Sequence, residues 1–253
     1  MNLIPILTIA KKEVQHIVKL PFQVLGAPVA TTVLYFLVFG RAIGGRVGPI
    51  QGISYSEFIM PGLIMMNVVT GTFNGVTSSL ILSKYMNTFN DLLISPMSYL
   101  EIVLGYVTGQ VGRALVTAAT IFLTAQLFIP FHIEHPFFIL LFLMVVASCF
   151  ALFGFMVAIA ADNFEQLSIF PNFIIMPLSF LGGIFYSVDM LPGFARTLSH
   201  YNPLLYMISG MRYGFYGISD VTPLVAWAAV LFVFALLLTG AWRMLASGYK
   251  LKN

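Results

Sequence analysis

The chain has 253 residues, of which 59% are hydrophobic and 8% are charged, whereas a soluble domain carries about 25% charged residues. This composition excludes a soluble globular protein. The formal net charge of +3 comes from 12 Lys and Arg residues, and they are scattered without the basic stripe that follows a phosphate backbone, which excludes a nucleic-acid partner. The single cysteine, Cys149, excludes a disulfide framework and a Cys-rich metal site. We therefore expect a membrane protein.

Long uncharged intervals mark the expected membrane spans, because a charge near the bilayer centre costs a few kcal/mol or more. Six intervals reach the ~20 residues that a helix needs to cross ~30 Å of hydrocarbon. They are residues 20–40, 58–83, 102–129 with Arg113 inside, 136–161, 166–188 and 221–242. Runs of this length without polar and apolar alternation are typical of helices and not of barrel strands. The sequence thus predicts an all-α membrane protein, with residues 1–253 forming one domain of six transmembrane helices.

The positions of Lys and Arg predict the orientation, since cytoplasmic segments carry an excess of both. The two ends and the inner loops hold seven of these residues, including every lysine, and the outer segments hold four arginines. The inner set is Lys11, Lys12, Lys19, Lys84, Arg243, Lys250 and Lys252, and the outer set is Arg41, Arg46, Arg196 and Arg212. Both termini are therefore expected in the cytoplasm.

An amphipathic helix is expected before the first span, at residues 1–19. Its apolar stripe repeats at spacings of four and three residues and comprises Leu3, Leu7, Ala10, Val14 and Ile17, while the other face carries Lys11, Lys12, Glu13, Gln15, His16 and Lys19. Such a helix would lie in the headgroup plane on the cytoplasmic side. The alternative is a solvated N-terminal tail.

The inner loop at residues 84–98 has the same character on a smaller scale. Its apolar side comprises Met86, Phe89, Leu92 and Leu93, its polar side Asn87, Asn90 and Asp91, and Pro96 ends it. A short helix with apolar residues at the membrane edge indicates a docking surface for a soluble partner. The alternative is a helix that rests its apolar side on lipid.

The outer segment at residues 187–222 is too apolar for a solvated loop, yet Pro, Gly and charged residues interrupt it. Two short helices fit better, at about 190–199 and 203–217, with Pro203 in the first turn of the second. The pair either dips into the outer leaflet as a re-entrant hairpin or lies flat on the outer surface. Its tyrosines, Tyr206 among them, suit either arrangement because tyrosine prefers the interface.

Signals for chemistry are few. The chain has no Gly-Lys pair and therefore no phosphate-binding loop for ATP. The acids are expected at helix ends or in loops, which argues against proton coupling, whereas sodium coupling through backbone carbonyls stays open. The cluster His132, Glu134 and His135 lies on a short turn without the spacing of a metal site. Neither GxSxG nor HExxH occurs, so we expect no enzyme, no metal and no cofactor in this chain.

A few polar residues fall inside the expected spans. Arg113 either snorkels towards the cytoplasmic interface or faces a polar cavity or an acid of another helix or subunit, which would make it functional. Asn67 and Asn74 belong to a polar series in the second span, where amides and hydroxyls also join helices without touching a substrate. With Tyr206, these residues are candidates for a transport path or gate.

Four segments carry a resemblance to a known family. They are PLSFLGGIFYSVDMLP at 177–192, SHYNPLLYMISGMRYGFYG at 199–217, FIMPGLIMMN at 58–67 and DLLISPMS at 91–98. Together with six spans in the same order, they resemble the ABC-2 type transporter permeases of bacterial inner membranes. The resemblance is closest to the small permeases that export drugs, polysaccharides and lipids.

The resemblance implies a permease that works as two copies with two separate cytoplasmic ATPase subunits, which bind the ATP and Mg²⁺. It makes the loop after the second span the coupling helix, with Phe89, Asn90, Asp91, Leu92 and Leu93 contacting the ATPase. Family members often carry paired glutamates before the two leucines, where this chain has Asn90 and Asp91. The expected function is export of a lipid, a glycan or a hydrophobic drug. The alternative is an ion-coupled secondary transporter or channel without ATPase subunits.

Overall fold

The computed structural model describes residues 3–129 and 133–249. It is all-helical, with 81% helix, and six of its helical segments are long and apolar enough to cross a membrane. The first span joins α2 (Pro21–Tyr35) to the π-helical η1 (Phe36–Ile43), and the fifth joins α7 (Phe164–Phe170), η2 (Pro171–Ile175) and α8 (Met176–Leu181). The others are α3 (Tyr55–Tyr85), α5 (Tyr99–Gln126), α6 (Pro136–Ala160) and α11 (Pro223–Ala246). The prediction of an all-α protein with six candidate spans is confirmed.

Local sequence signals explain where these helices begin and break. Capping boxes start α3 at Ser54 with Glu57, and α5 at Ser98 with Glu101, so that the first free N–H groups are satisfied. The fifth span changes to a π-helix at Pro171, because proline removes a backbone hydrogen bond inside a helix. It ends at Leu181 and not near 188 as predicted, because Gly183 turns the chain with φ +82.

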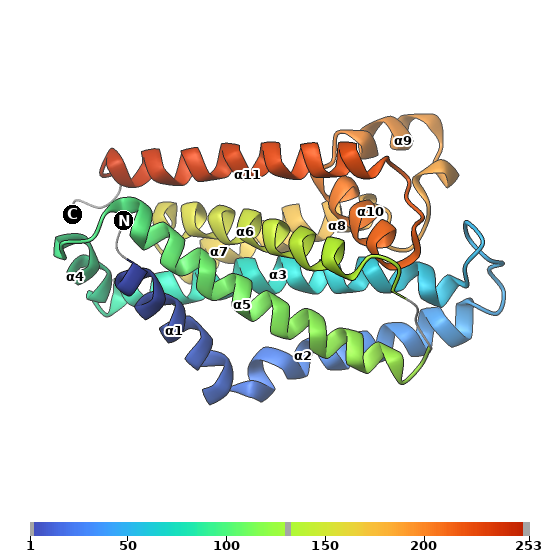
Figure 1. Ribbon diagram of the computed structural model, residues 1–253, viewed down its shortest axis with the longest axis horizontal. Coiled ribbons are helices and arrows are strands. Elements are labelled where there is room, and N and C mark those ends of the chain that lie inside the picture. The colour runs from blue at the N-terminus through green and yellow to red at the C-terminus, as the bar shows by residue number, and fades with distance from the viewer. Residues whose placement is uncertain (1–2, 130–132, 250–253) are drawn as a thin grey trace.

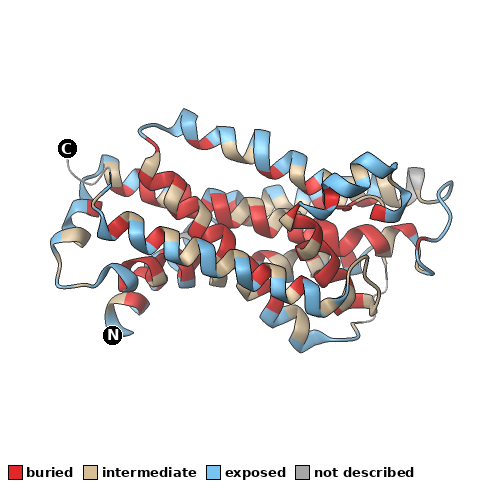
Figure 2. Ribbon diagram, turned by 90° about the horizontal axis from the view of Figure 1, so that it is seen from above, coloured by how far each residue is buried: buried red, intermediate tan, exposed pale blue. Residues whose placement is uncertain are grey.

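Helix α3 forms the centre of the bundle (Figure 1), and it packs against α5, α6 and α10. Buried residues gather along this central layer, while the surrounding helices are exposed along their outer flanks (Figure 2). The contact between α3 and α6 is close at Gly154, where a Cβ atom would lie 2.5 Å from Val76 Cγ1 and 3.0 Å from the carbonyl oxygen of Phe73. The core therefore depends on small residues that bring two spans together.

Two further helices lie at the end of the bundle that carries both chain ends (Figure 1). Helix α1 (Leu3–Lys19) packs along α5, and α4 (Thr88–Ile94) follows α3. The face of α1 that is buried differs from the prediction. It comprises Ile6, Ile9, Ala10, Glu13 and Ile17, whereas Leu3, Leu7 and Val14 are exposed. The hydrophobic arc of α1 is wide enough to divide between the protein and its surroundings: of the predicted stripe, Ala10 and Ile17 face the protein, and Leu3, Leu7 and Val14 face outward.

The segment between the fifth and sixth spans contains two helices after a short 3-10 turn, η3 (Val188–Met190): α9 (Gly193–His200) and α10 (Pro203–Tyr216). The predicted pair of helices is thus present. Helix α9 is largely exposed, whereas α10 is mostly buried among α3, α6 and α11. A hairpin lying flat on the outer surface does not fit the burial of α10. Re-entry into the bilayer is consistent with it and stays a prediction.

The glycine at the α3–α6 contact gives a first test. The change Gly154→Ala should destabilise the protein by about 1–3 kcal/mol, because its methyl group overfills the contact with Val76 and Phe73. The measurement is the thermal unfolding midpoint of the purified protein in detergent. Gly26→Ala is the matched control, since nothing lies within 4 Å of the added atom; equal midpoints for both variants would contradict the close contact.

Candidate functional site

The connection between α3 and α4 is tied to the end of α6. The Lys84 ammonium donates hydrogen bonds to the carbonyl oxygens of Ala158 at 2.9 Å, Ile159 at 2.7 Å and Ala161 at 3.3 Å. These carbonyls belong to the C-terminal end of a helix, which carries partial negative charge. A displacement of the α3–α4 connection therefore reaches α6 directly.

The predicted docking residues of α4 point in two directions. Phe89 is buried, and Leu92 and Leu93 are partly buried against the protein's own core, while Asn90 and Asp91 are exposed. Phe89 therefore holds α4 on the bundle, and the role of the apolar stripe as a docking contact stays a prediction, since Leu92 and Leu93 keep part of their surface. The exposed residues of α4 include Asn90, Asp91 and Ile94, the last being 84% exposed.

A polar face of α3 is left uncovered by the rest of the chain. Asn67, Thr70 and Gly71 are half-buried, and Asn74 and Ser78 are exposed; their spacing of three and four residues puts them on one face. The Asn67 amide donates to its own helix at Leu63 O, 2.9 Å away. The side chains of Asn74 and Ser78 make no hydrogen bond to any part of the chain that the structure describes. This face crosses the middle of the span, where lipid offers no hydrogen-bond partner.

Arg113 belongs to α5 and approaches α3 on a different side from the polar face. Its Nη1 comes within 2.9 Å of the position of a Cβ atom on Gly75, next to Gln110, and its charge attracts the Glu13 carboxylate of α1. This attraction favours an acid on another helix over snorkelling as the explanation of Arg113. Whether Arg113 acts in transport stays a prediction.

Glu13 is an acid that the sequence interpretation assigned to the solvated face of α1. It is 6% exposed, accepts a hydrogen bond from the Ser79 hydroxyl of α3 and another, 2.8 Å long, from Gln110 Nε2 of α5. The expectation that the acids lie only at helix ends and in loops is wrong at this position. A signal was available in the spacing of Ile6, Ile9, Ala10, Glu13 and Ile17, which defines one helical face.

A second buried polar cluster closes the opposite end of the bundle. The fully buried Arg212 of α10 forms an ion pair of 2.6 Å with Asp220, donates to Gly183 O at 2.7 Å and lies 3.7 Å from the centre of the Phe58 ring. Asp220 also accepts hydrogen bonds from Ser187 and from Gln51. The sequence analysis placed Arg212 in an outer segment, and its complete burial was not expected. The cluster joins three parts of the chain that are distant in the sequence, residues 51–58, 183–187 and 212–220.

Tyr206, the fourth candidate for a path or gate, is half-buried at the junction of α9 and α10. Its hydroxyl donates to the carbonyl oxygen of His200 at 2.7 Å. Nearby, Asn202 donates to Leu178 O at 2.6 Å and caps α10 by accepting from Leu204 N. Tyr206 thus fastens the hairpin, and it is distant in the sequence from Asn67 and Asn74.

The predicted polar turn between α5 and α6 is only partly described, since His132 lies outside the described residues. The backbone N–H of Glu134 donates to Phe215 O at 3.1 Å, and that of His135 donates to Gly214 O at 2.9 Å. The His135 ring stacks on Tyr213. Among the described residues, no three metal-binding side chains gather in one place. The described part of the turn therefore serves to hold the end of α10.

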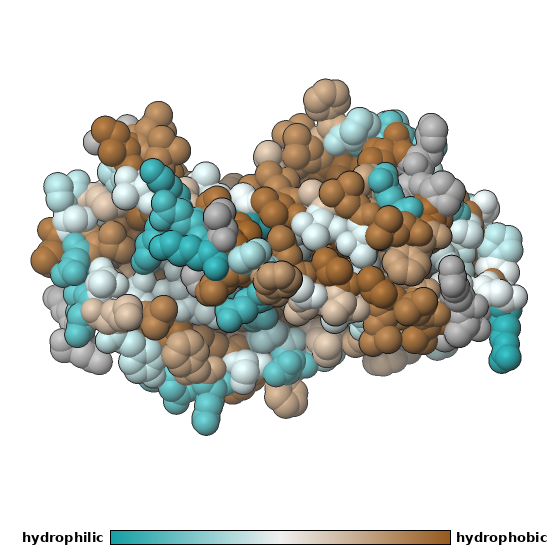
Figure 3. Space-filling model, turned by 90° about the horizontal axis from the view of Figure 1, so that it is seen from below, coloured by the Kyte–Doolittle hydropathy of each residue, from teal (hydrophilic) through white to brown (hydrophobic). Residues whose placement is uncertain are grey.

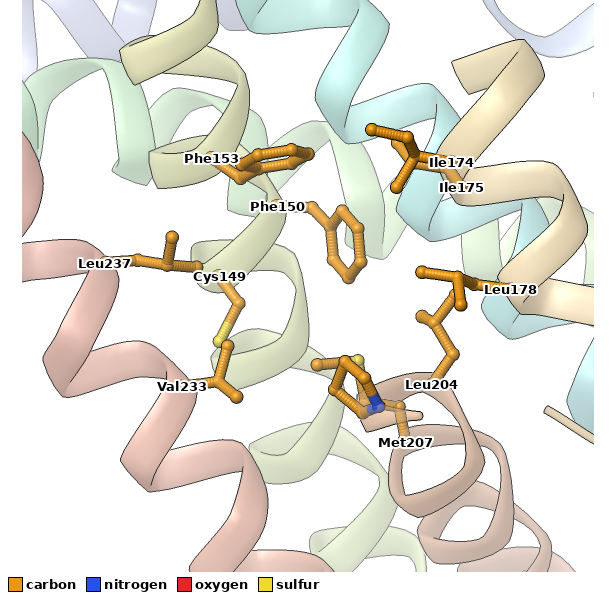
Figure 4. A pocket seen from close by; sticks show the side chains of 11 residues that line it. Cys149, Phe150, Phe153, Ile174, Ile175, Leu178, Leu204, Met207, Val233 and Leu237 are labelled. Atoms are coloured by element: carbon orange, nitrogen blue, oxygen red, sulfur yellow. The ribbon is translucent and has the colours of Figure 1, made fainter. Parts of the chain in front are cut away.

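An apolar cavity of about 190 Å³ lies between the fifth span, α6, α10 and α11 (Figure 4). The side chains that line it include Cys149, Phe150, Leu178, Met207 and Leu237. A selective ligand site needs a few placed polar groups in addition to apolar walls, and this cavity offers none. It suits a hydrocarbon chain and carries no information on which molecule is selected.

The buried ion pair gives a second test. Arg212→Met should cost about 3–5 kcal/mol, because it leaves Asp220 buried without a counter-charge. The double variant Arg212→Met/Asp220→Asn should lose less. The exposed pair of Arg196 and Asp189, with side chains 51% and 65% exposed, provides the control, and Arg196→Met should cost about 0–1 kcal/mol. Equal losses in reversible unfolding for Arg212→Met and Arg196→Met would contradict a structural role of the pair.

Comparison with known proteins gives a consistent result. The model of the ABC-2 type transporter family matches residues 5–216. The inner membrane transport permease YadH of Escherichia coli strain K12 is 43% identical over 223 residues, which cover 88% of this chain and 87% of that protein. Nodulation protein J of Rhizobium leguminosarum bv. viciae is 24% identical over 184 residues, or 72% of this chain and 71% of the relative.

Proposed function

The chain belongs to the ABC-2 type transporter family, and we propose that it is the membrane subunit of an ATP-driven exporter that carries a lipid, a glycan or a hydrophobic drug outward. Two copies of the chain would work with two cytoplasmic ATPase subunits, which bind ATP and Mg²⁺. The observation that carries the proposal is the polar face of α3. One copy leaves Asn74 and Ser78 uncovered at mid-membrane, and a facing copy or a cargo would cover them.

The cytoplasmic end supplies the contact for the ATPase. Helix α4 is fixed to the bundle by Phe89, and it exposes Asn90, Asp91 and Ile94. Closure of the ATPases on ATP would push α4, and the Lys84 bonds would transmit the push to α6. The push would shift the equilibrium between two packings of the same helices, because the ATPases would bind these two packings with different affinities.

The location follows from the relative and from the charge pattern. YadH is named an inner membrane permease, and we assign the present chain to the bacterial inner membrane as well. Its surface supports this, since apolar side chains cover much of the face in Figure 3 and hydrophilic ones gather towards the end that carries α1 and α4. The excess of lysine at both ends and in the inner loops supports a cytoplasmic location of the two termini.

An ion-coupled carrier without ATPases is the alternative, and buried Glu13 is the one feature that favours it. That carboxylate is already held by Ser79 and Gln110. The Glu13 carboxylate also contacts α3 at Ser79, which lies on a different side of this helix from Asn74. Transport in vesicles that hold the permease alone, without nucleotide, would favour the carrier over the exporter.

The α4 surface gives a test of the ATPase contact. Ile94→Asp should reduce co-purification of the partner ATPase by about tenfold or more, because a charge replaces an exposed apolar anchor. The matched control is Tyr249→Asp, which changes a residue 51% exposed beyond α11, at the same end of the bundle. Unchanged co-purification for Ile94→Asp, with the permease normally inserted, would remove α4 as the docking site.

The polar face of α3 gives a test of the number of copies. In a Cys149→Ala background, Asn74→Cys should be linked to a second copy by a short bifunctional thiol reagent, since the two faces would lie opposite each other. Phe232→Cys on α11, 68% exposed, should remain unlinked. The measurement is the mass of the product on denaturing gels. An active complex that contains one permease copy would contradict the proposal.

A further inference from the structure

We propose that Glu13 is a positioning residue, whose carboxylate fixes helix α1 to α3 and α5 so that the three helices move as one body. Its contacts come from two spans, because the hydroxyl of Ser79 in α3 and the Nε2 of Gln110 in α5 both donate to it. The two donors reach different oxygens of the carboxylate. A single side chain of α1 therefore bridges two membrane helices.

Three glycines of α5 make room for this contact. A Cβ atom on Gly109 would lie 2.5 Å from Glu13 Cβ and 3.2 Å from Ala10 Cα, and one on Gly105 would lie 2.8 Å from Ile9 Cβ. Gly112 continues the row towards Val14, at 3.4 Å. Small residues at this spacing let two helix backbones approach closely, so α1 is seated in a groove of α5 and its carboxylate is carried into the interior.

A charged group near the carboxylate offsets part of the cost of burying it. Arg113 attracts it from α5, and its Nη1 lies beside Gly75 of α3. A buried carboxylate that is paired in this way is costly to disrupt by removal of one partner. The cluster is therefore a specific joint and not an incidental polar contact.

The consequence for the molecule depends on the function proposed above. Helix α1 exposes Leu3, Ile4 and Leu7 on its outward side, where it would rest in the cytoplasmic headgroup layer. With Glu13 in place, a push on α4 or α1 would move α3 and α5 together, and the polar face of α3 would follow. Without it, α1 would detach from the spans and the push would be dissipated.

Amide hydrogen exchange of the purified permease in lipid nanodiscs tests the joint without any ATPase. Glu13→Ala should raise the exchange of α1 amides about tenfold, because hydrogen bonds to a charged group are lost. The exchanged pair Glu13→Gln/Gln110→Glu should restore protection to within about twofold of wild type, since it rebuilds the amide–carboxylate contact with the charge near Arg113. Gln15→Ala, an exposed residue on the other side of α1, should behave as wild type.

A second measurement separates this inference from the proposed function. In the complex with the ATPase, nucleotide trapping should change the thiol labelling of Asn74→Cys when Glu13 is intact. Glu13→Ala should abolish that change, and the exchanged pair should restore it. Unchanged α1 exchange in Glu13→Ala, or failure of the exchanged pair to rescue it, would overturn the joint. If labelling never responds to nucleotide, the ATP-driven function fails, and the exchange result still decides the joint.

Discussion

The hydrocarbon of a bilayer offers no hydrogen-bond partner, and every polar group at membrane depth must find one within the protein or in another molecule. This constraint explains the helical spans, which satisfy their own backbones, and it also organises the polar side chains. The carboxylates of Glu13 and Asp220 are held within the chain, by residues from two and three separate segments respectively, while Arg212 Nε and Gln110 Oε1 are buried without a hydrogen-bond partner among the described residues. On the polar face of α3, the side chains of Asn74 and Ser78 make no hydrogen bond to the described residues. We propose that a second copy or a cargo covers them, and the proposed function rests on this.

Much of the fold could be predicted because its signals are local. Runs of uncharged residues located six spans, and Pro203 located the second hairpin helix, α10. The end of the fifth span was missed because the turn at Gly183 is set by a positive φ angle, while the following residues remain apolar. Hydropathy alone cannot distinguish a continuing helix from an apolar turn.

The site was harder to predict, because burial of a charge depends on residues far away in the sequence. Asp220 accepts hydrogen bonds from Gln51 and Ser187, which lie 169 and 33 residues away in the sequence. Glu13 meets Gln110 across 97 residues. The apolar side chains of Phe89, Leu92 and Leu93 indicated an apolar contact. The sequence does not show whether that contact is made with the chain's own helix bundle or with a partner protein. Asn67 and Asn74 were identified by their position within a span, where an amide always requires an explanation.

The polar face of α3 also suggests why an exporter of this kind would be assembled from two copies. When the copies are closed, amides and hydroxyls of one α3 could pair with those of the other, and the path would be dry. When they separate, the same groups would bind water or the polar part of a cargo. The same amides and hydroxyls would have hydrogen-bond partners in both states, so the two states can lie close in free energy. A modest bias from the ATPases would then be enough to shift the population. A face lined by strong charges would lack this balance, because separating it in a membrane would cost too much.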